Sequence, residues 1–209
     1  MEKEKVLEHI RDAIVQGKYS SEHRLIEREL CNEFNAKRSC VRQALQQLSV
    51  EGFVSIEHFK GAWVAKLEQR DIAQIYDILG ALEGLSIRIA IATINDIKIR
   101  KIESLIIKIE KNCKNATKLY KANMELHKYI TSLSNNPRLI SFCKNLRLQA
   151  YRMSLENFYI SEQVQASLIE HRTILDCIKR HDALTAENLI REHYQKSQNR
   201  LIKAINNSL

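Results

Sequence analysis

Residues 37–52, KRSCVRQALQQLSVEG, decide how the first third of the chain folds. Apolar residues recur there at three- and four-residue spacing, at Val41, Leu45 and Leu48. That spacing places them on one face of a helix. No acidic residue interrupts the stretch before Glu51, and Gly52 is suited to the left-handed conformation that ends a helix. The stretch therefore predicts an amphipathic helix from about Arg38 to Glu51 with a basic exposed face.

Shorter elements flank this helix on both sides. A first helix is indicated by apolar residues at helical spacing before Gly17, namely Val6, Ile10, Ile14 and Val15. A second short helix fits Glu27 to Phe34, with a tight turn at Asn35-Ala36. Residues 53–56 and 62–65 are predicted to form two short strands joined by the turn 57–61. The expected order is helix, helix, helix and a β-hairpin.

The exposed face of the third predicted helix has the chemistry of a DNA-reading surface. Cations cluster at its start, at Lys37, Arg38 and Arg42, and hydrogen-bonding side chains follow at Ser39, Gln43, Gln46 and Gln47. Cations contact phosphates, and Arg or Gln reads base edges in the major groove. Lys60-Gly61, at the hairpin tip, is placed to reach the flanking backbone. The alternative is a solvated basic face, because residues 1–70 carry 12 Lys or Arg against 11 Asp or Glu.

The rest of the chain has only helical periodicity. Six amphipathic segments can be drawn: 71–93, 96–113, 117–134, 137–160, 162–180 and 183–206. Long helices with short connections predict an antiparallel bundle. The expected fold is mainly α, with a winged helix-turn-helix over residues 1–67, a linker at 68–71 and a helical bundle over 72–209.

Composition narrows the partners and the compartment. The formal net charge is +8, which favours an anionic partner without identifying one. The five cysteines form no CxxC, so reduced thiols are expected rather than a disulfide framework or thiolate zinc site. The charged N-terminus is unlike a signal peptide, and no apolar stretch approaches the roughly 20 residues of a membrane span. A cytoplasmic protein without a membrane partner is expected.

Four polar residues of the predicted bundle could bind a metal. Asn123 and His127 are spaced i, i+4 on one helix face, and His171 and His193 lie on two later helices. Imidazoles that converge in a bundle core can bind a divalent metal, with the Asn123 side-chain carbonyl as an oxygen ligand. The alternative is that each histidine is an ordinary surface or core residue.

Residues 17–65 resemble the DNA-binding domain of the GntR superfamily. The matching string comprises Gly17, Arg24-Leu25-Ile26-Glu27-Arg28-Glu29-Leu30, Arg38-Ser39-Cys40-Val41-Arg42-Gln43-Ala44-Leu45, Leu48, Glu51-Gly52-Phe53-Val54 and Gly61. The resemblance implies that Arg28, Arg38, Ser39 and Arg42 contact the operator and that Gly61 lies at the wing tip. Lys37 departs from the usual Ser or Thr helix cap, and a lost cap costs about 1 kcal/mol. Cys40 stands where proline is common.

Residues 72–209 resemble the FCD ligand-binding domain of the FadR subfamily, in its shorter, six-helix VanR-like form. The marks are Asn123-Met124-Glu125-Leu126-His127, Asn136-Pro137-x-Leu139, Glu170-His171-x-x-Ile174-Leu175 and Asp182-Ala183-x-x-Ala186 before His193. The resemblance implies that Asn123, His127, His171 and His193 hold Zn²⁺, Ni²⁺ or a similar ion. It also implies a small carboxylate effector at that metal.

Two departures qualify the implied site. Asn123 replaces the usual aspartate, so a weaker, partly filled metal site is expected. Leu79 replaces an arginine that often binds the effector. Arg147 and Arg152 are candidates for its role, and the alternative is that both are surface arginines.

The leading hypothesis is a ligand-responsive transcriptional regulator and not an enzyme. It would bind an inverted-repeat operator in double-stranded DNA as a homodimer. Repression relieved by ligand is the commoner family outcome, with activation left open. One alternative is a constitutive DNA-binding protein with a structural metal. The other is a metal-dependent hydrolase, disfavoured because Glu125, Glu170 and Glu192 should point away from the histidines.

Overall fold

The computed structural model describes residues 3–57, 60–156 and 161–206, and it divides the chain into two compact units, 1–68 and 69–209. Residues 69 and 70, expected in a linker, instead open the long helix that was predicted to begin at Asp71, so that part of the prediction is wrong. This charged stretch suits the first turn of a helix, because the negative charge of Asp71 interacts favourably with the positive end of the helix dipole.

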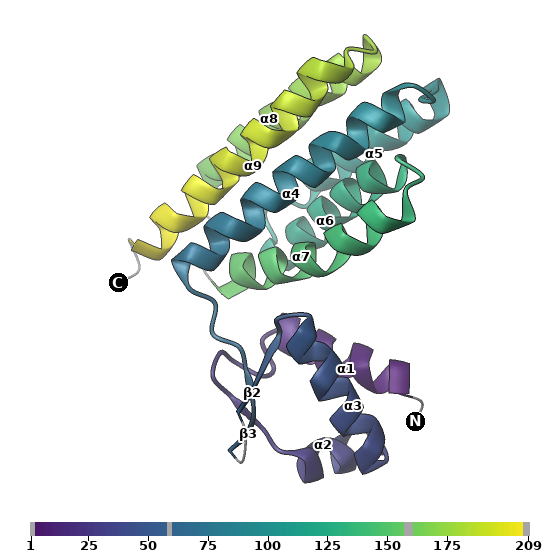
Figure 1. Ribbon diagram of the computed structural model, residues 1–209. Helices are drawn as coiled ribbons and strands as arrows, with labels where there is room; N and C mark the ends of the chain where they lie inside the picture. The colour runs from purple at the N-terminus through teal and green to yellow at the C-terminus, as the bar shows by residue number, and fades with distance from the viewer. Residues whose placement is uncertain (1–2, 58–59, 157–160, 207–209) are drawn as a thin grey trace. The chain divides into compact units, whose positions relative to one another are not determined.

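Three helices and a small sheet make up the first unit (Figure 1). The helices are α1 (Lys3–Val15), α2 (Glu27–Glu33) and α3 (Arg38–Val50). Their apolar faces meet in one core, in which Ile10, Leu30, Leu48 and Phe53 are almost fully buried. Arg11 of α1 and Glu51 after α3 form a buried ion pair at 2.7 Å, which ties the two helices together. The predicted order of elements is confirmed.

The sheet has one more strand than expected. β2 (Val54–Glu57) and β3 (Gly61–Val64) form the predicted hairpin, and β1 (Arg24–Leu25) pairs with β3 on its other side. The strand order is β1-β3-β2, all antiparallel. A two-residue strand has no alternation pattern, which is why the sequence did not predict it. His58 and Phe59, within the predicted turn, lie outside the described residues.

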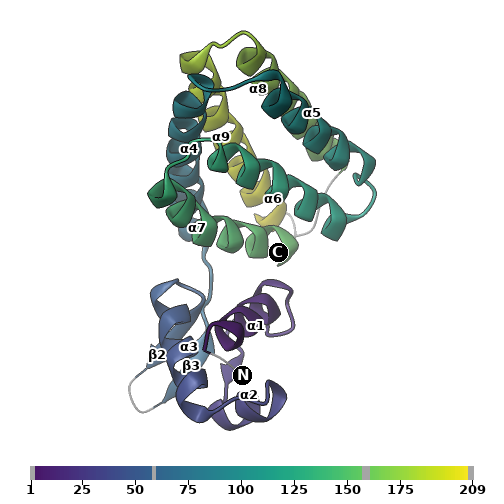
Figure 2. The same cartoon turned by 90° about the vertical axis from the view of Figure 1, so that its right-hand side faces the viewer.

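Six helices and, among the described residues, no strand make up the second unit. They are α4 (Gln69–Ile91), α5 (Asp96–Lys111), α6 (Ala116–Ser132), α7 (Pro137–Glu156), α8 (Ser161–Lys179) and α9 (Ala183–Asn206). All six predicted segments are helical, although residues 157–160, placed in the fourth, lie outside the described residues. Within this unit, Figure 2 shows α4 and α9 side by side and α6 and α7 on another face of α4.

Helices α4 and α9 approach closely because α4 has glycine at Gly80 and Gly84. A Cβ atom at Gly84 would lie 3.1 Å from the backbone oxygen of Glu187, and one at Gly80 would lie 3.2 Å from the Tyr194 Cβ. The pairing places His193 and Tyr194 of α9 against the polar centre of the unit.

Two compositional expectations bear on the fold. All five cysteines are free. None of the helices that the structure describes is long and apolar enough to cross a membrane.

Candidate functional site

The predicted DNA-facing side chains of α3 are all exposed. Lys37, Arg38, Ser39, Arg42 and Gln43 point to solvent, while Val41, Ala44, Leu45 and Leu48 fill the core. Lys37 caps the helix with its backbone alone, since its side chain makes no capping hydrogen bond. The helix therefore keeps its apolar face inside and a polar, cationic face free for a ligand.

Two arginines of this face share one carboxylate. Arg38 Nε donates to Glu27 Oε2 at 2.7 Å, and Arg42 donates through Nε to Oε1 at 3.0 Å and through Nη2 to Oε2 at 3.2 Å. The hydrogen bonds from Arg42 and then Arg38 outweigh desolvation and hold the pKa of Glu27 below its usual value. Sequence reasoning matched Glu27 to the family motif without giving it a role.

The remaining predicted contacts lie on the wing and on α2. Lys60 and Gly61 are exposed, with Lys60 Nζ 2.8 Å from Glu57 Oε2, and Arg28 is exposed on α2. Arg24 of β1 donates through Nη2 to the Lys60 carbonyl at 3.1 Å, which ties the third strand to the wing. Residues of these elements and of α3 line a basic hollow of about 460 Å³. Its lining includes Arg24, Glu27, Arg28, Arg38, Arg42 and Gly61.

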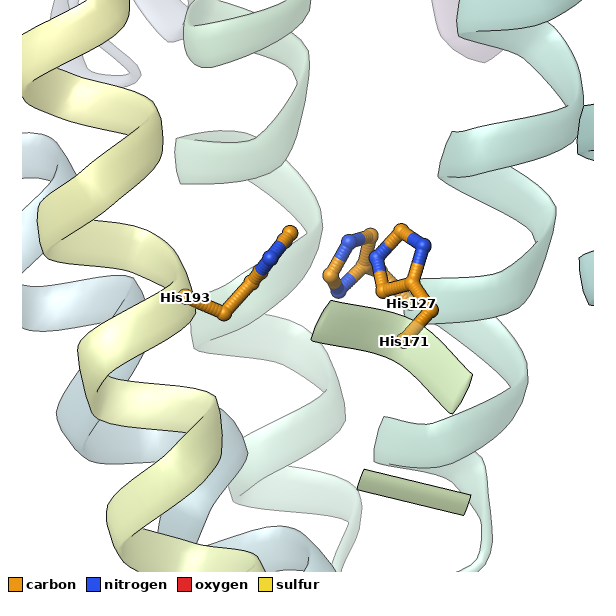
Figure 3. Close-up of side chains that lie close together, drawn as sticks. All are labelled: His127, His171 and His193. Atoms are coloured by element: carbon orange, nitrogen blue, oxygen red, sulfur yellow. The ribbon is translucent and has the colours of Figure 1, made fainter. Parts of the chain in front are cut away.

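In the second unit, three histidines meet. His127 of α6, His171 of α8 and His193 of α9 are buried, and their candidate ligand atoms lie within 4.8 Å of one another. Figure 3 shows the three imidazoles turned toward one another. The rings of His171 and His193 are closest, with centroids 4.5 Å apart. The structure thus brings together the three histidines that the sequence singled out.

Two carboxylates orient two of these rings. His127 Nδ1 lies 2.7 Å from Glu83 Oε2, and His193 Nδ1 lies 2.7 Å from Glu170 Oε2. A carboxylate on one ring nitrogen fixes the tautomer and leaves the other nitrogen for a metal. The expectation that Glu170 points away from the histidines is therefore wrong. Glu170 precedes His171 but reaches across to α9, whereas Glu125 and Glu192 are exposed and pair with lysines.

Each of the two carboxylates also binds an arginine. Arg147 of α7 donates through Nε and Nη2 to Glu83 Oε1, and its Nη2 also donates to the Thr131 hydroxyl at 2.6 Å. Arg200 of α9 donates through Nη1 and Nη2 to Glu170 at 2.7 and 3.0 Å. The result is two chains of contacts, Arg147–Glu83–His127 and Arg200–Glu170–His193.

These arginines hold the carboxylates in the charged form. Burial alone would raise the pKa of Glu83, but Arg147 and His127 hold it at about 2. Burial opposes ionisation of Glu170 as well, and hydrogen bonds from His193 and Arg200 lower its pKa to about 2. Both carboxylates are therefore anionic acceptors for the histidine N–H groups.

A cavity of about 150 Å³ adjoins the histidines. His127, His193, Asn123, Arg147 and Arg200 line it, together with tyrosine and serine side chains, which are Tyr76, Tyr120, Tyr151, Tyr194, Ser154, Ser167 and Ser197. Asn123 is half-buried, one helical turn before His127 on α6. Arg147 and Arg152 are both buried, so the surface alternative is wrong, but Arg152 is not among the lining residues.

One observation indicates that the histidine cluster suits a divalent metal. Both ring nitrogens of His171 are buried without a hydrogen-bond partner among the described residues. Desolvation, reinforced by the neighbouring histidines, lowers the pKa of His171 well below its usual value, so the ring is neutral and has a lone pair to donate. A buried polar group without a partner is costly. A metal coordinated by the three rings would satisfy it.

Comparison with known proteins bears on both units. Residues 2–64 match the bacterial regulatory proteins of the gntR family, and residues 74–196 match the FCD domain. The chain belongs to the gntR family of regulators with an FCD domain. Like its relatives, it is a DNA-binding transcriptional regulator and not an enzyme. The hydrolase alternative is therefore excluded.

Three of the matches to known proteins illustrate the similarity of this gntR-family regulator to others. The chain is 22% identical over 188 residues to an uncharacterised HTH-type transcriptional regulator, YdhC, of Bacillus subtilis, covering 88% of this chain and 84% of the relative. It is 26% identical over 183 residues to the gluconate operon transcriptional repressor of Bacillus licheniformis, covering 83% and 74%. The solved structure of McbR/YncC of Escherichia coli superposes with a TM-score of 0.81 at 17% identity, covering 96% and 97%. That likeness shows the fold.

Proposed function

We propose that this chain is a metabolite-responsive repressor whose second unit binds a divalent metal and a small anionic effector. Zn²⁺ or Ni²⁺ would be held by His127, His171 and His193, with Asn123 as an oxygen ligand. The observation that carries the proposal is the buried histidine cluster, in which neither ring nitrogen of His171 has a hydrogen-bond partner in the described part of the chain. Imidazole nitrogen suits both ions.

The cavity beside the cluster supports an anionic effector. Arg147 and Arg200 line it, and each keeps its position through a buried or half-buried glutamate. With a divalent ion bound, the cations and the metal exceed the two glutamates in charge, so a carboxylate would be attracted. The tyrosine and serine hydroxyls offer further hydrogen bonds.

Operator binding as a two-fold dimer completes the proposal. Arg28, Arg38, Ser39, Arg42, Gln43, Lys37, Lys60 and Gly61 would make the DNA contacts. An apolar stripe on α4, formed by Ile78, Leu82, Leu85 and Ile89, stays exposed or half-exposed in the single chain and supports a second copy as its partner. Effector binding would shift the population of DNA-binding conformations and so release the operator.

The test begins with an operator selected from random duplexes by the purified full-length chain. Zinc-loaded protein is then titrated onto this duplex with and without candidate small acids. Release of the duplex by one acid, lost in His171→Gln, supports the proposal. If no acid affects binding and zinc changes only the unfolding temperature, the metal is structural and the regulator is constitutive.

A further inference from the structure

The clearest feature that the proposed function leaves without a role is Glu27 at the first position of α2. Its carboxylate accepts three hydrogen bonds from Arg38 and Arg42 of α3, so two DNA-facing cations share one anion. The exposed fractions of the side chains are 75% for Arg38, 57% for Arg42 and 27% for Glu27. The arginines therefore reach solvent, while the carboxylate sits behind them.

The direction of these bonds decides which edge of each arginine remains available. Arg38 uses Nε, and Arg42 uses the side edge formed by Nε and Nη2. A guanidinium has five N–H donors in a planar fork, so the Nη1/Nη2 end of each group still has donors pointing away from Glu27. Two parallel donors from one arginine are what the O6 and N7 acceptors of guanine require.

The second consequence is electrostatic. Arg24, Arg28, Arg38 and Arg42 line the basic hollow, and Glu27 is the single acidic residue among the described residues of that lining. Its lowered pKa keeps it ionised at neutral pH. It therefore reduces the local positive charge that would otherwise attract any phosphate backbone regardless of sequence.

We propose that Glu27 is a positioning residue that sets DNA specificity, by holding the side edges of Arg38 and Arg42 and by suppressing non-specific phosphate binding. It need not touch DNA to do so. The inference rests on the proposed operator contacts of these arginines. The competing role is structural, because an acidic residue in the first turn stabilises α2 through the helix dipole.

The experiment compares four purified full-length chains: the parent, Glu27→Gln, Glu27→Asp and the control Glu29→Gln. Glu29 is an exposed acidic residue two positions along α2, so its replacement removes the same charge without touching Arg38 or Arg42. The probes are a duplex enriched by the parent from random sequences of about 30 base pairs, long enough for two half-sites, and its shuffled counterpart. Affinity for both is measured by fluorescence anisotropy over a range of salt concentrations.

In Glu27→Gln, affinity for the shuffled duplex should rise about tenfold, and the slope of log affinity against log salt should steepen by about one, as one more phosphate contact forms. The ratio of specific to non-specific affinity should fall by about tenfold or more, because the arginines lose their fixed orientation. Glu27→Asp keeps the charge but shortens the reach. It should therefore lose specificity without gaining affinity for the shuffled duplex.

The inference is overturned if Glu27→Gln matches Glu29→Gln in both the ratio and the salt slope, while the parent still selects an operator. It is also overturned if Glu27→Gln loses affinity for both duplexes equally and unfolds at a lower temperature, which is the signature of a structural role. If the parent enriches no sequence at all, the proposed operator binding fails and this inference fails with it.

Discussion

The two units use the same motif, a glutamate shared by two basic side chains, in opposite surroundings. In the first unit, Glu27 lies 27% exposed beneath two exposed arginines. In the second, Glu83 is 0% exposed and Glu170 is 15% exposed, each bound to one arginine and one histidine. Exposed ion pairs contribute little to the free energy of unfolding and are screened by salt. Removing one partner of a buried ion pair is strongly destabilising, because the other charge is left buried without a partner.

The comparison teaches what each contact is suited to do. An ion pair in water can be exchanged for a DNA phosphate or base with little change in the fold. A buried pair keeps a ligand-binding side chain in place before the ligand arrives. Four substitutions test this contrast.

The largest effect is expected for Glu83→Gln. The change leaves Arg147 buried without its counter-charge, so the free energy of unfolding should fall by about 3–5 kcal/mol. Urea unfolding followed by circular dichroism measures it. Glu110→Gln, which breaks the exposed pair with Arg172, is the control and should change the same quantity by less than about 1 kcal/mol. Equal losses in the two variants would contradict the contrast.

The next effect concerns metal affinity. Glu170→Gln weakens the acceptor that orients His193, so zinc affinity should fall by about 10- to 100-fold. Competition against a chromogenic chelator measures it. Glu192→Gln is a matched control, because Glu192 adjoins His193 in sequence but pairs with Lys196 at the surface. An unchanged zinc affinity in Glu170→Gln would remove the carboxylate from any role in the site.

Arg42→Ala is expected to act on DNA alone. If Arg42 reads a base as proposed, its loss should weaken operator binding by about 1–3 kcal/mol while zinc binding stays as in the parent. Anisotropy with the selected duplex measures the first and chelator competition the second. Arg172→Ala removes an exposed arginine of the second unit and should leave the operator affinity unchanged. The assignment of α3 to the DNA surface fails if Arg42→Ala binds the operator as the parent does.

The smallest effect is the stability change in Glu27→Gln. Both of its arginine partners are exposed, so the free energy of unfolding should change by less than about 1 kcal/mol. The same urea titration as for Glu83→Gln gives the value directly. A loss as large as that of Glu83→Gln would mean that the half-buried Glu27 carboxylate has a structural role.

Sequence periodicity predicted the helices well because each buries one apolar face. Leu45 and Leu48 marked α3, and the six long segments of the second unit all proved helical. Strand β1 was missed because a two-residue strand shows no periodicity, and the hydrogen bond from Arg24 to the wing joins residues 36 positions apart. Likewise, nothing in the sequence around Gly80 and Gly84 indicates that another helix packs there, yet these glycines permit the close approach of α9.

Apart from Asn123 and Arg147, the sequence predicted only the innermost residues of the candidate site, the histidines. The i, i+4 spacing on α6 and the family resemblance pointed to the histidines, since those residues carry a recognisable pattern. Their carboxylate partners could not be found that way, because Glu83 lies 44 residues from His127 and Glu170 lies 23 from His193. The same holds for Arg200, which sequence reasoning passed over and which lines the cavity.

The central claim is that His127, His171 and His193 form a metal site, and the most direct test is zinc content. The purified chain is stripped with a chelator, reloaded with zinc, desalted and measured by elemental analysis beside His171→Gln and His9→Ala. His9 is an exposed histidine of the first unit and serves as the control. The account predicts about one zinc per chain in the parent and in His9→Ala, and almost none in His171→Gln. A parent that retains no zinc, or a His171→Gln variant that retains as much as the parent, would contradict it.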